Sequence, residues 1–74
     1  MRRSTNDIAV DILRAAKNGA TKTHIISEVN INFNIAQKYL EMLNEKELIR
    51  HESGLFITTN KGKVFQEMAK ELKL

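Results

Sequence analysis

The fold of this protein is decided by residues 21–46, TKTHIISEVNINFNIAQKYLEMLNEK. Two apolar stripes at helical spacing lie within this stretch, first Ile25, Ile26 and Val29 and then Ala36, Tyr39, Leu40 and Leu43. Threonines at its start supply hydroxyl groups of the kind that begin helices, and residues 30–32 separate the two stripes. The stretch therefore predicts a short helix over 22–29, a tight turn and a longer helix over 33–46.

A short helix, a three-residue turn and a longer helix are the parts of a helix-turn-helix, which inserts its second helix into the major groove of DNA. Because the apolar stripe of that helix faces inward, its other positions face outward: Asn34, Gln37, Lys38, Glu41, Asn44 and Glu45. Asn and Gln can bind adenine through two hydrogen bonds, and Lys can reach guanine. We therefore expect Asn34, Gln37 and Lys38 to contact bases. The glutamates further along are repelled by phosphate, which restricts base contact to the N-terminal half of the helix.

The segment before this stretch predicts another helix. Ser4 and Asp7 have the spacing of a capping box, in which two side chains satisfy free backbone N–H groups. Five apolar residues then share one helical face: Ile8, Ala9, Ile12, Leu13 and Ala16. Gly19 can adopt the left-handed conformation that ends many helices. We expect this helix over 4–17.

The segment after it predicts a hairpin over 48–58, turning at residues 52–54, and a last helix over 60–73 that Thr59 can cap. One side of this helix is apolar: Val64, Phe65, Met68, Ala69 and Leu72. That side can close the core against the first helix or contact a second copy of the chain, and we expect it to do both. The sequence therefore predicts a single winged helix-turn-helix domain over 1–74, mainly α with a small β-hairpin as its wing.

The composition excludes several classes of protein. The chain has 74 residues, 12 basic and 9 acidic side chains and a formal net charge of +3, which permits phosphate binding without requiring it. It has no cysteine, its two histidines are isolated, and no apolar run approaches the ~20 residues of a membrane span. No nucleophile has a partnered base, and no glycine-rich loop could hold phosphate. We therefore expect a cytoplasmic protein that is not an enzyme and uses no metal, cofactor, membrane or small-molecule substrate.

Further residues are candidates for contact with the DNA backbone. Residues 21–23 begin the short helix, where free N–H groups and the positive helix end favour phosphate. Arg50 and His51 precede the hairpin turn and could extend the wing along flanking DNA. The full predicted DNA-binding set is Thr21, Lys22, Thr23, Asn32, Asn34, Gln37, Lys38, Arg50, His51 and Lys61. Backbone contacts of this kind add affinity rather than sequence preference.

Four segments resemble the small winged-helix DNA-binding proteins of archaea and their viruses. They are Lys22-Thr23-x-Ile25 with Asn30, Tyr39-Leu40-x-Met42-Leu43, Leu48-Ile49-Arg50, and Phe56-x-Thr58-Thr59-x-Lys61-Gly62. The likeness covers nearly the whole chain and is strongest at the close of the wing. It implies a winged-helix fold, DNA binding, and dimerisation through a C-terminal helix that forms a coiled coil in longer members. Since this sequence ends at Leu74, we expect a shorter contact between helices, through Phe65, Met68 and Leu72.

The function that these observations predict is transcriptional regulation by a homodimer that binds double-stranded DNA. Its two half-sites are expected about one helical turn apart. The alternative is a winged helix that binds other proteins and not DNA, which the modest charge and Glu41, Glu45 and Glu47 favour. The two functions differ in a measurable way, because only the first predicts an affinity for DNA that depends on salt.

Overall fold

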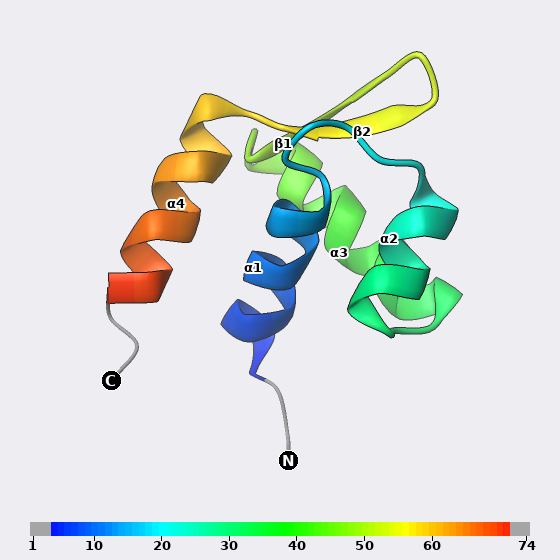
Figure 1. The fold of residues 1–74 in the computed structure, drawn as a ribbon, viewed down its shortest axis with the longest axis horizontal. Helices are drawn as coiled ribbons and strands as arrows, with labels where there is room; N and C mark the ends of the chain where they lie inside the picture. Colours follow the sequence, from blue (N-terminus) through cyan, green and yellow to red (C-terminus); the bar gives the residue numbers. More distant parts are fainter. Residues whose placement is uncertain (1–3, 72–74) are drawn as a thin grey trace.

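The computed structural model describes the backbone of residues 4–71 and the side chains of residues 4–69. Within this range the elements are α1 (Thr5–Ala15), α2 (Lys22–Val29), α3 (Phe33–Glu45), β1 (Ile49–Glu52), β2 (Leu55–Thr58) and α4 (Asn60–Glu71). α1 lies in the middle and packs against α2 on one side and α4 on the other, while the hairpin crosses the C-terminal end of α1 (Figure 1). The architecture is mainly helical with one small hairpin, as the sequence predicts. No helix of the described range is long and apolar enough to cross a membrane.

The turn between α2 and α3 is built from two asparagines with different tasks. Asn30 has a φ of 62°, and this left-handed conformation ends α2. Asn32 begins α3, because its side-chain oxygen accepts the backbone N–H of Ile35 at 2.8 Å. Ile31 lies between them and packs against the core. The sequence Asn-Ile-Asn therefore fixes the angle at which α3 leaves α2.

The beginning of α1 agrees with the prediction and its end does not. The predicted capping box of Ser4 and Asp7 is present, with hydrogen bonds of 3.1 and 3.2 Å between side chains and backbone nitrogens. The helix ends at Ala15, two residues before the predicted end at 17. The chain turns away at Ala16, whose carbonyl oxygen accepts the backbone N–H of Gly19 at 3.1 Å and that of Thr58 at 3.0 Å. That oxygen is bound to β2, so the last turn of α1 joins the hairpin.

α3 also ends one residue before its predicted end at 46. β1 begins at Ile49, one residue after position 48, where the predicted hairpin begins. Glu47 has a φ of 64°, which is a left-handed conformation. The N–H of Leu48 then donates back to the carbonyl of Leu43 at 2.8 Å. This is the hydrogen bond of a helix-ending Schellman motif. Leu48 therefore belongs to the end of α3 and Ile49 is the first strand residue.

β1 and β2 form an antiparallel pair whose register is Ile49↔Thr58, Arg50↔Ile57, His51↔Phe56 and Glu52↔Leu55. The turn residues Ser53 and Gly54 both have positive φ, 51° and 79°, as a type I′ hairpin turn requires. Ala20, in the loop before α2, exchanges two backbone hydrogen bonds of 2.9 and 2.7 Å with Phe56. The wing is therefore attached to the loop that leads into the helix-turn-helix.

The core lies between α1, α2, α3 and the start of β1. Its largest fully buried side chains are Ile12, Leu13, Ile25, Leu43 and Ile49. One polar side chain of the described range is buried with them, that of Thr58, which is 4% exposed. Its hydroxyl donates to the carbonyl oxygen of Leu13 at 2.6 Å, so burial leaves no group unpaired. Thr58 thus connects β2 to the last turn of α1 through both its backbone and its side chain.

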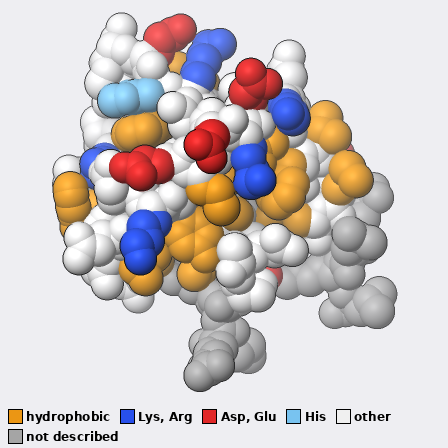
Figure 2. Space-filling view, turned by 180° about the vertical axis from the view of Figure 1, so that it is seen from behind, with side chains coloured by type: hydrophobic (Ala, Val, Ile, Leu, Met, Phe, Trp, Pro, Cys, Tyr) orange, Lys and Arg blue, Asp and Glu red, His pale blue; other side chains and the backbone are white. Residues whose placement is uncertain are grey.

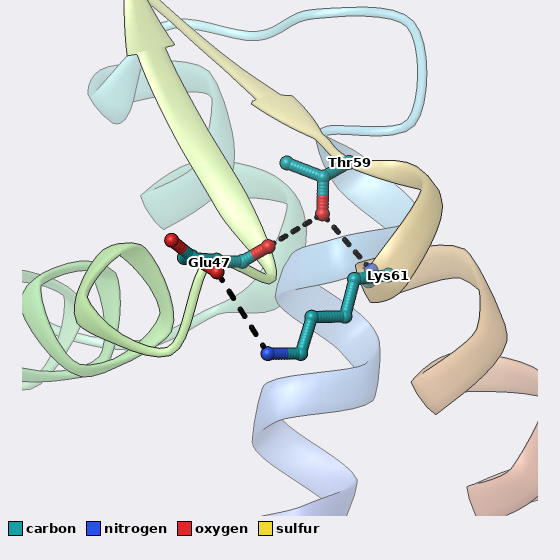
Figure 3. A network of polar contacts seen from close by, with 4 residues as sticks. Glu47, Thr59 and Lys61 are labelled. Carbon is teal, nitrogen blue, oxygen red and sulfur yellow. Dashed lines mark hydrogen bonds and ion pairs between the residues drawn. The ribbon is translucent and has the colours of Figure 1, made fainter.

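α4 is attached to the corner where α3 meets β1 (Figure 3). The hydroxyl of Thr59 donates to the carbonyl of Glu47 at 2.7 Å and accepts the N–H of Gly62 at 3.0 Å. Thr59 therefore caps α4, as predicted, and at the same time binds the end of α3. Lys61 adds an exposed ion pair of 3.9 Å to the Glu47 carboxylate. The predicted end of this helix at 73 lies outside the described residues.

Candidate nucleic-acid interface

The exposed face of α3 carries most of the polar side chains that the sequence predicts for it. Asn34, Lys38, Glu41, Asn44 and Glu45 are exposed. The opposite side of the helix is buried through Ala36, Leu40 and Leu43. Asn34 and Lys38 lie on the first two turns, at the end of the helix that follows the tight turn from α2. This is the end that a helix-turn-helix brings closest to the bases.

Gln37 differs from the other predicted base contacts because it is half-buried and already bound within the chain. Its side-chain oxygen accepts a hydrogen bond from the ammonium of Lys22. Its side-chain nitrogen donates to the carboxylate of Glu41 at 2.6 Å. The ammonium of Lys22 also lies over the ring of Phe33, 4.6 Å from its centre. Lys22 is therefore half-buried between α2 and α3 rather than extended into solvent.

A groove of about 310 Å³ runs between α3 and the hairpin. It is lined by Lys22, Gln37, Leu40, Glu41, Asn44, His51, Gly54 and Phe56. Figure 2 shows the face of the molecule on the far side of Figure 1, where acidic, basic and hydrophobic side chains lie among one another. No large region of one charge covers this face. This face therefore exerts little long-range attraction on phosphate, and short-range contacts must supply most of its preference for particular DNA sites.

The two residues of the hairpin that are predicted to contact DNA, Arg50 and His51, lie on opposite faces of it. His51 stacks on Phe56 across the strands, with ring centres 4.2 Å apart and planes inclined by 3°, and both line the groove beside α3. Arg50 lies on the opposite face, because side chains alternate along a strand. Its guanidinium is 3.8 Å from the Glu52 carboxylate, and both groups are exposed. The charge of Arg50 is thus partly offset by its neighbour.

The start of α2 lies beside the first turns of α3, whereas the start of α4 lies beyond the C-terminal end of α3. Thr21 and Thr23 are exposed, and Thr21 uses its hydroxyl to cap α2 by accepting the N–H of His24 at 3.1 Å. Asn32 is exposed and caps α3. Lys61 is paired with Glu47, beyond the C-terminal end of α3. α3 has 13 residues, so that end is about 18 Å from the first turn.

Phe33 and the groove are features of this surface that sequence patterns missed. Phe33 is the first residue of α3 and is 52% exposed, with its ring beside the ammonium of Lys22. A signal for it was present in the sequence, because Phe33 precedes Gln37 by four residues and so lies on the same flank of the helix. The groove had no such signal, since its two walls belong to different elements and their spacing depends on how these elements pack.

The residues predicted to contact a second copy of the chain have different surroundings. Phe65 is partly buried and packs against the core. Met68 is 57% exposed, and Val64, one turn earlier on α4, is 56% exposed. Leu72 lies outside the described residues. Within the described part of α4, the exposed apolar surface is therefore formed by Val64 and Met68 rather than by Phe65.

These features, a short helix and a longer helix joined by a tight turn and flanked by a hairpin, define a winged helix-turn-helix protein. The family model described as winged helix-turn-helix matches residues 2–74, and the chain belongs to that family. It is similar to the crystal structure of Sso10a-2, described as a DNA-binding protein from Sulfolobus solfataricus, with 33% identity and a TM-score of 0.84. The match covers 93% of this chain and 77% of that one. No match is found among curated proteins.

The resemblance to small archaeal winged-helix proteins is thereby confirmed. The structure gives a physical reason for the segment that carries it most strongly, Phe56-x-Thr58-Thr59-x-Lys61-Gly62. Phe56 binds the loop before α2, Thr58 binds the end of α1, and Thr59 binds the end of α3. Each of these residues attaches the wing or α4 to a different part of the core. The residues that carry the resemblance therefore hold the wing and α4 against the core.

Proposed function

We propose that this protein is a non-enzymatic transcriptional regulator that binds double-stranded DNA, with α3 in the major groove and the hairpin along the flanking backbone. The observation that carries the proposal is the exposed polar start of α3 beside the wing, in a chain similar to a protein described as DNA-binding. Asn34 and Lys38 project from the first two turns of α3, and both residue types can bind base edges.

The proposed contacts to the DNA backbone surround this helix. Thr21, Lys22 and Thr23 begin α2, where backbone N–H groups are available to a phosphate oxygen. Asn32 begins α3, and Arg50 and His51 belong to the wing. Lys61 would bind phosphate only beyond the C-terminal end of α3, because its partner Glu47 lies there. These residues would fix the position of α3 on the duplex.

We propose further that the protein acts as a homodimer through α4. Val64 and Met68 are both more than half exposed, four residues apart, and therefore lie on one flank of the helix. A second copy would bury this surface, with Met68 in the contact and Phe65 supporting it from the core side. Leu72, the third residue that the sequence predicts for this contact, lies outside the described residues. A two-fold dimer would bind two half-sites about 34 Å apart, which is one turn of DNA.

The major-groove contact can be tested by methylation interference. Methylation of guanine N7 blocks the major groove, whereas methylation of adenine N3 blocks the minor groove. We expect methyl groups at N7 within each half-site to prevent binding, and methyl groups at N3 there to have a smaller effect. Interference confined to adenine N3 would contradict insertion of α3 into the major groove.

A further inference from the structure

Three side chains on one flank of α3 and the start of α2 are joined in a chain of hydrogen bonds. Nζ of Lys22 donates to Oε1 of Gln37, and Nε2 of Gln37 donates to Oε2 of Glu41 at 2.6 Å. A lysine ammonium can only donate, and an ionised carboxylate can only accept. The two partners therefore determine which end of the Gln37 amide is oxygen and which is nitrogen.

Both ends of this chain of hydrogen bonds are themselves held in place. Lys22 is the first residue of α2, and its ammonium lies 4.6 Å from the centre of the Phe33 ring, where the charge is attracted to the ring face. Glu41 follows Gln37 by four residues on α3, so the two side chains lie one turn apart on the same flank. The orientation of the amide thus depends on the packing of α2 against α3.

The two ends of this chain of hydrogen bonds, Lys22 and Glu41, carry charges of opposite sign. The ammonium of Lys22 and the carboxylate of Glu41 offset one another, so the three residues together attract phosphate only weakly. Two atoms of the amide each retain one unused hydrogen-bonding position, a lone pair on Oε1 and a hydrogen on Nε2. What this flank offers to DNA is therefore a donor and an acceptor in a fixed order.

We propose that Lys22 and Glu41 are positioning residues that hold Gln37 so that it selects adenine, an inference that rests on the proposed insertion of α3 into the major groove. Adenine presents a donor, N6–H, beside an acceptor, N7, which matches Oε1 and Nε2. Guanine presents two acceptors, O6 and N7, so one of them would face the amide oxygen. A glutamine free to rotate could turn its nitrogen toward guanine. The fixed amide of Gln37 cannot do so without breaking both of its contacts.

The test is a comparison of adenine and guanine at one position of a duplex. Selection from a random pool gives the preferred site, and Gln37→Ala identifies the base pair whose preference depends on this residue. Affinities are then measured by fluorescence anisotropy for two duplexes that differ only there, A·T or G·C. We expect the wild-type protein to favour adenine by about tenfold or more. In Glu41→Gln and in Lys22→Met the ratio should fall to less than about threefold, because each variant loses a partner that fixes the order of donor and acceptor: the amide introduced by Glu41→Gln can donate as well as accept, and Lys22→Met removes the donor.

Glu45→Gln is the matched control, because it removes the same charge from the same helix one turn further on. It should raise the affinity for both duplexes together and leave the ratio unchanged, which separates positioning from charge. Circular dichroism melting checks that each variant is folded at the assay temperature.

Three results would overturn the inference. If the Gln37-dependent base is not adenine, or if the ratio persists in both Glu41→Gln and Lys22→Met, the inference fails while the proposed function stands. If the protein binds DNA with no position that depends on Gln37, the inference fails together with base contact by this residue.

Discussion

The Cα of Gly62 lies directly against the carbonyl oxygen of Leu48, so that a Cβ added at this glycine would overlap the oxygen. The same Cβ would lie 2.8 Å from the methyl carbon of Thr58. This contact is where α4 approaches the corner between α3 and β1, and the Thr59 hydroxyl caps α4 at the same place. The glycine in the segment Thr59-x-Lys61-Gly62 is therefore required by close packing and not by an unusual φ.

Gly62→Ala should destabilise the protein by at least about 2 kcal/mol, because backbone atoms have to move to admit the methyl group. Urea unfolding followed by circular dichroism measures this change. Gly54→Ala is the comparison, since nothing lies within 4 Å of its Cβ position but its φ is 79°. That variant should lose only about 1 kcal/mol, from backbone strain alone. Equal losses in the two variants would argue against the close contact at Gly62.

Thr58→Val should lower the free energy of unfolding by about 1 to 2 kcal/mol. The change keeps the shape of the side chain but removes the hydroxyl that donates to the carbonyl of Leu13 at 2.6 Å. Because this position is buried, water does not replace the lost donor. Thr23→Val, at an exposed position of α2, is the control and should be close to neutral. A Thr58→Val protein as stable as the wild type would show that this hydrogen bond contributes nothing.

Glu47→Gly should stabilise the protein by up to about 1 kcal/mol, because φ at this position is 64° and glycine adopts that conformation without a steric penalty. The ion pair lost with the side chain is exposed and worth little. Glu47→Ala separates the two effects, since it removes the charge but keeps the strain. We expect thermal unfolding to show a higher midpoint for glycine than for alanine. A lower midpoint for glycine would contradict this explanation of the end of α3.

Met68→Asp should produce a monomer if α4 forms the dimer contact. The side chain is 57% exposed in the single chain, so the substitution should leave the fold intact while placing a charge in the proposed interface. Sedimentation equilibrium over a range of concentrations measures the mass. Lys63→Gln, an exposed change on the same helix that lowers the net charge by the same one unit, controls for charge. A wild-type protein that remains monomeric at high concentration would exclude the dimer, and a variant that still dimerises would place the contact elsewhere.

Sequence patterns predicted the helix-turn-helix because its signals are local. The apolar stripe of Ala36, Leu40 and Leu43 fixes the buried side of α3, and caps such as Asn32 are recognisable within three residues. The end of α1 was misplaced because it depends on a partner elsewhere, whereas α3 ends in a local left-handed turn at Glu47, where the sequence has neither glycine nor asparagine. The carbonyl of Ala16 is bound to Thr58, 42 positions along the chain, and no periodicity records such a contact.

The candidate site likewise combines features with local signals in the sequence and features that depend on contacts between elements. Periodicity placed Asn34, Gln37 and Lys38 alike on the outward face of α3, but Gln37 is half-buried in the structure. That Gln37 is bound by Lys22 follows from the crossing of α2 and α3, which brings residues 15 positions apart into contact. The position of His51 against Phe56 depends likewise on hairpin register. Packing determines which residues of different elements become neighbours, and the pattern within one element does not reveal them.

The central claim, that this protein binds double-stranded DNA through its phosphates and grooves, is tested most directly by a salt titration. Fluorescence anisotropy of a labelled random-sequence duplex, measured at several salt concentrations, gives the affinity at each. We expect log affinity to fall linearly with log salt with a slope of about 4 to 8 for a dimer, as each phosphate contact releases counterions. No binding at low salt would contradict DNA binding and would favour the alternative of a winged helix that binds other proteins.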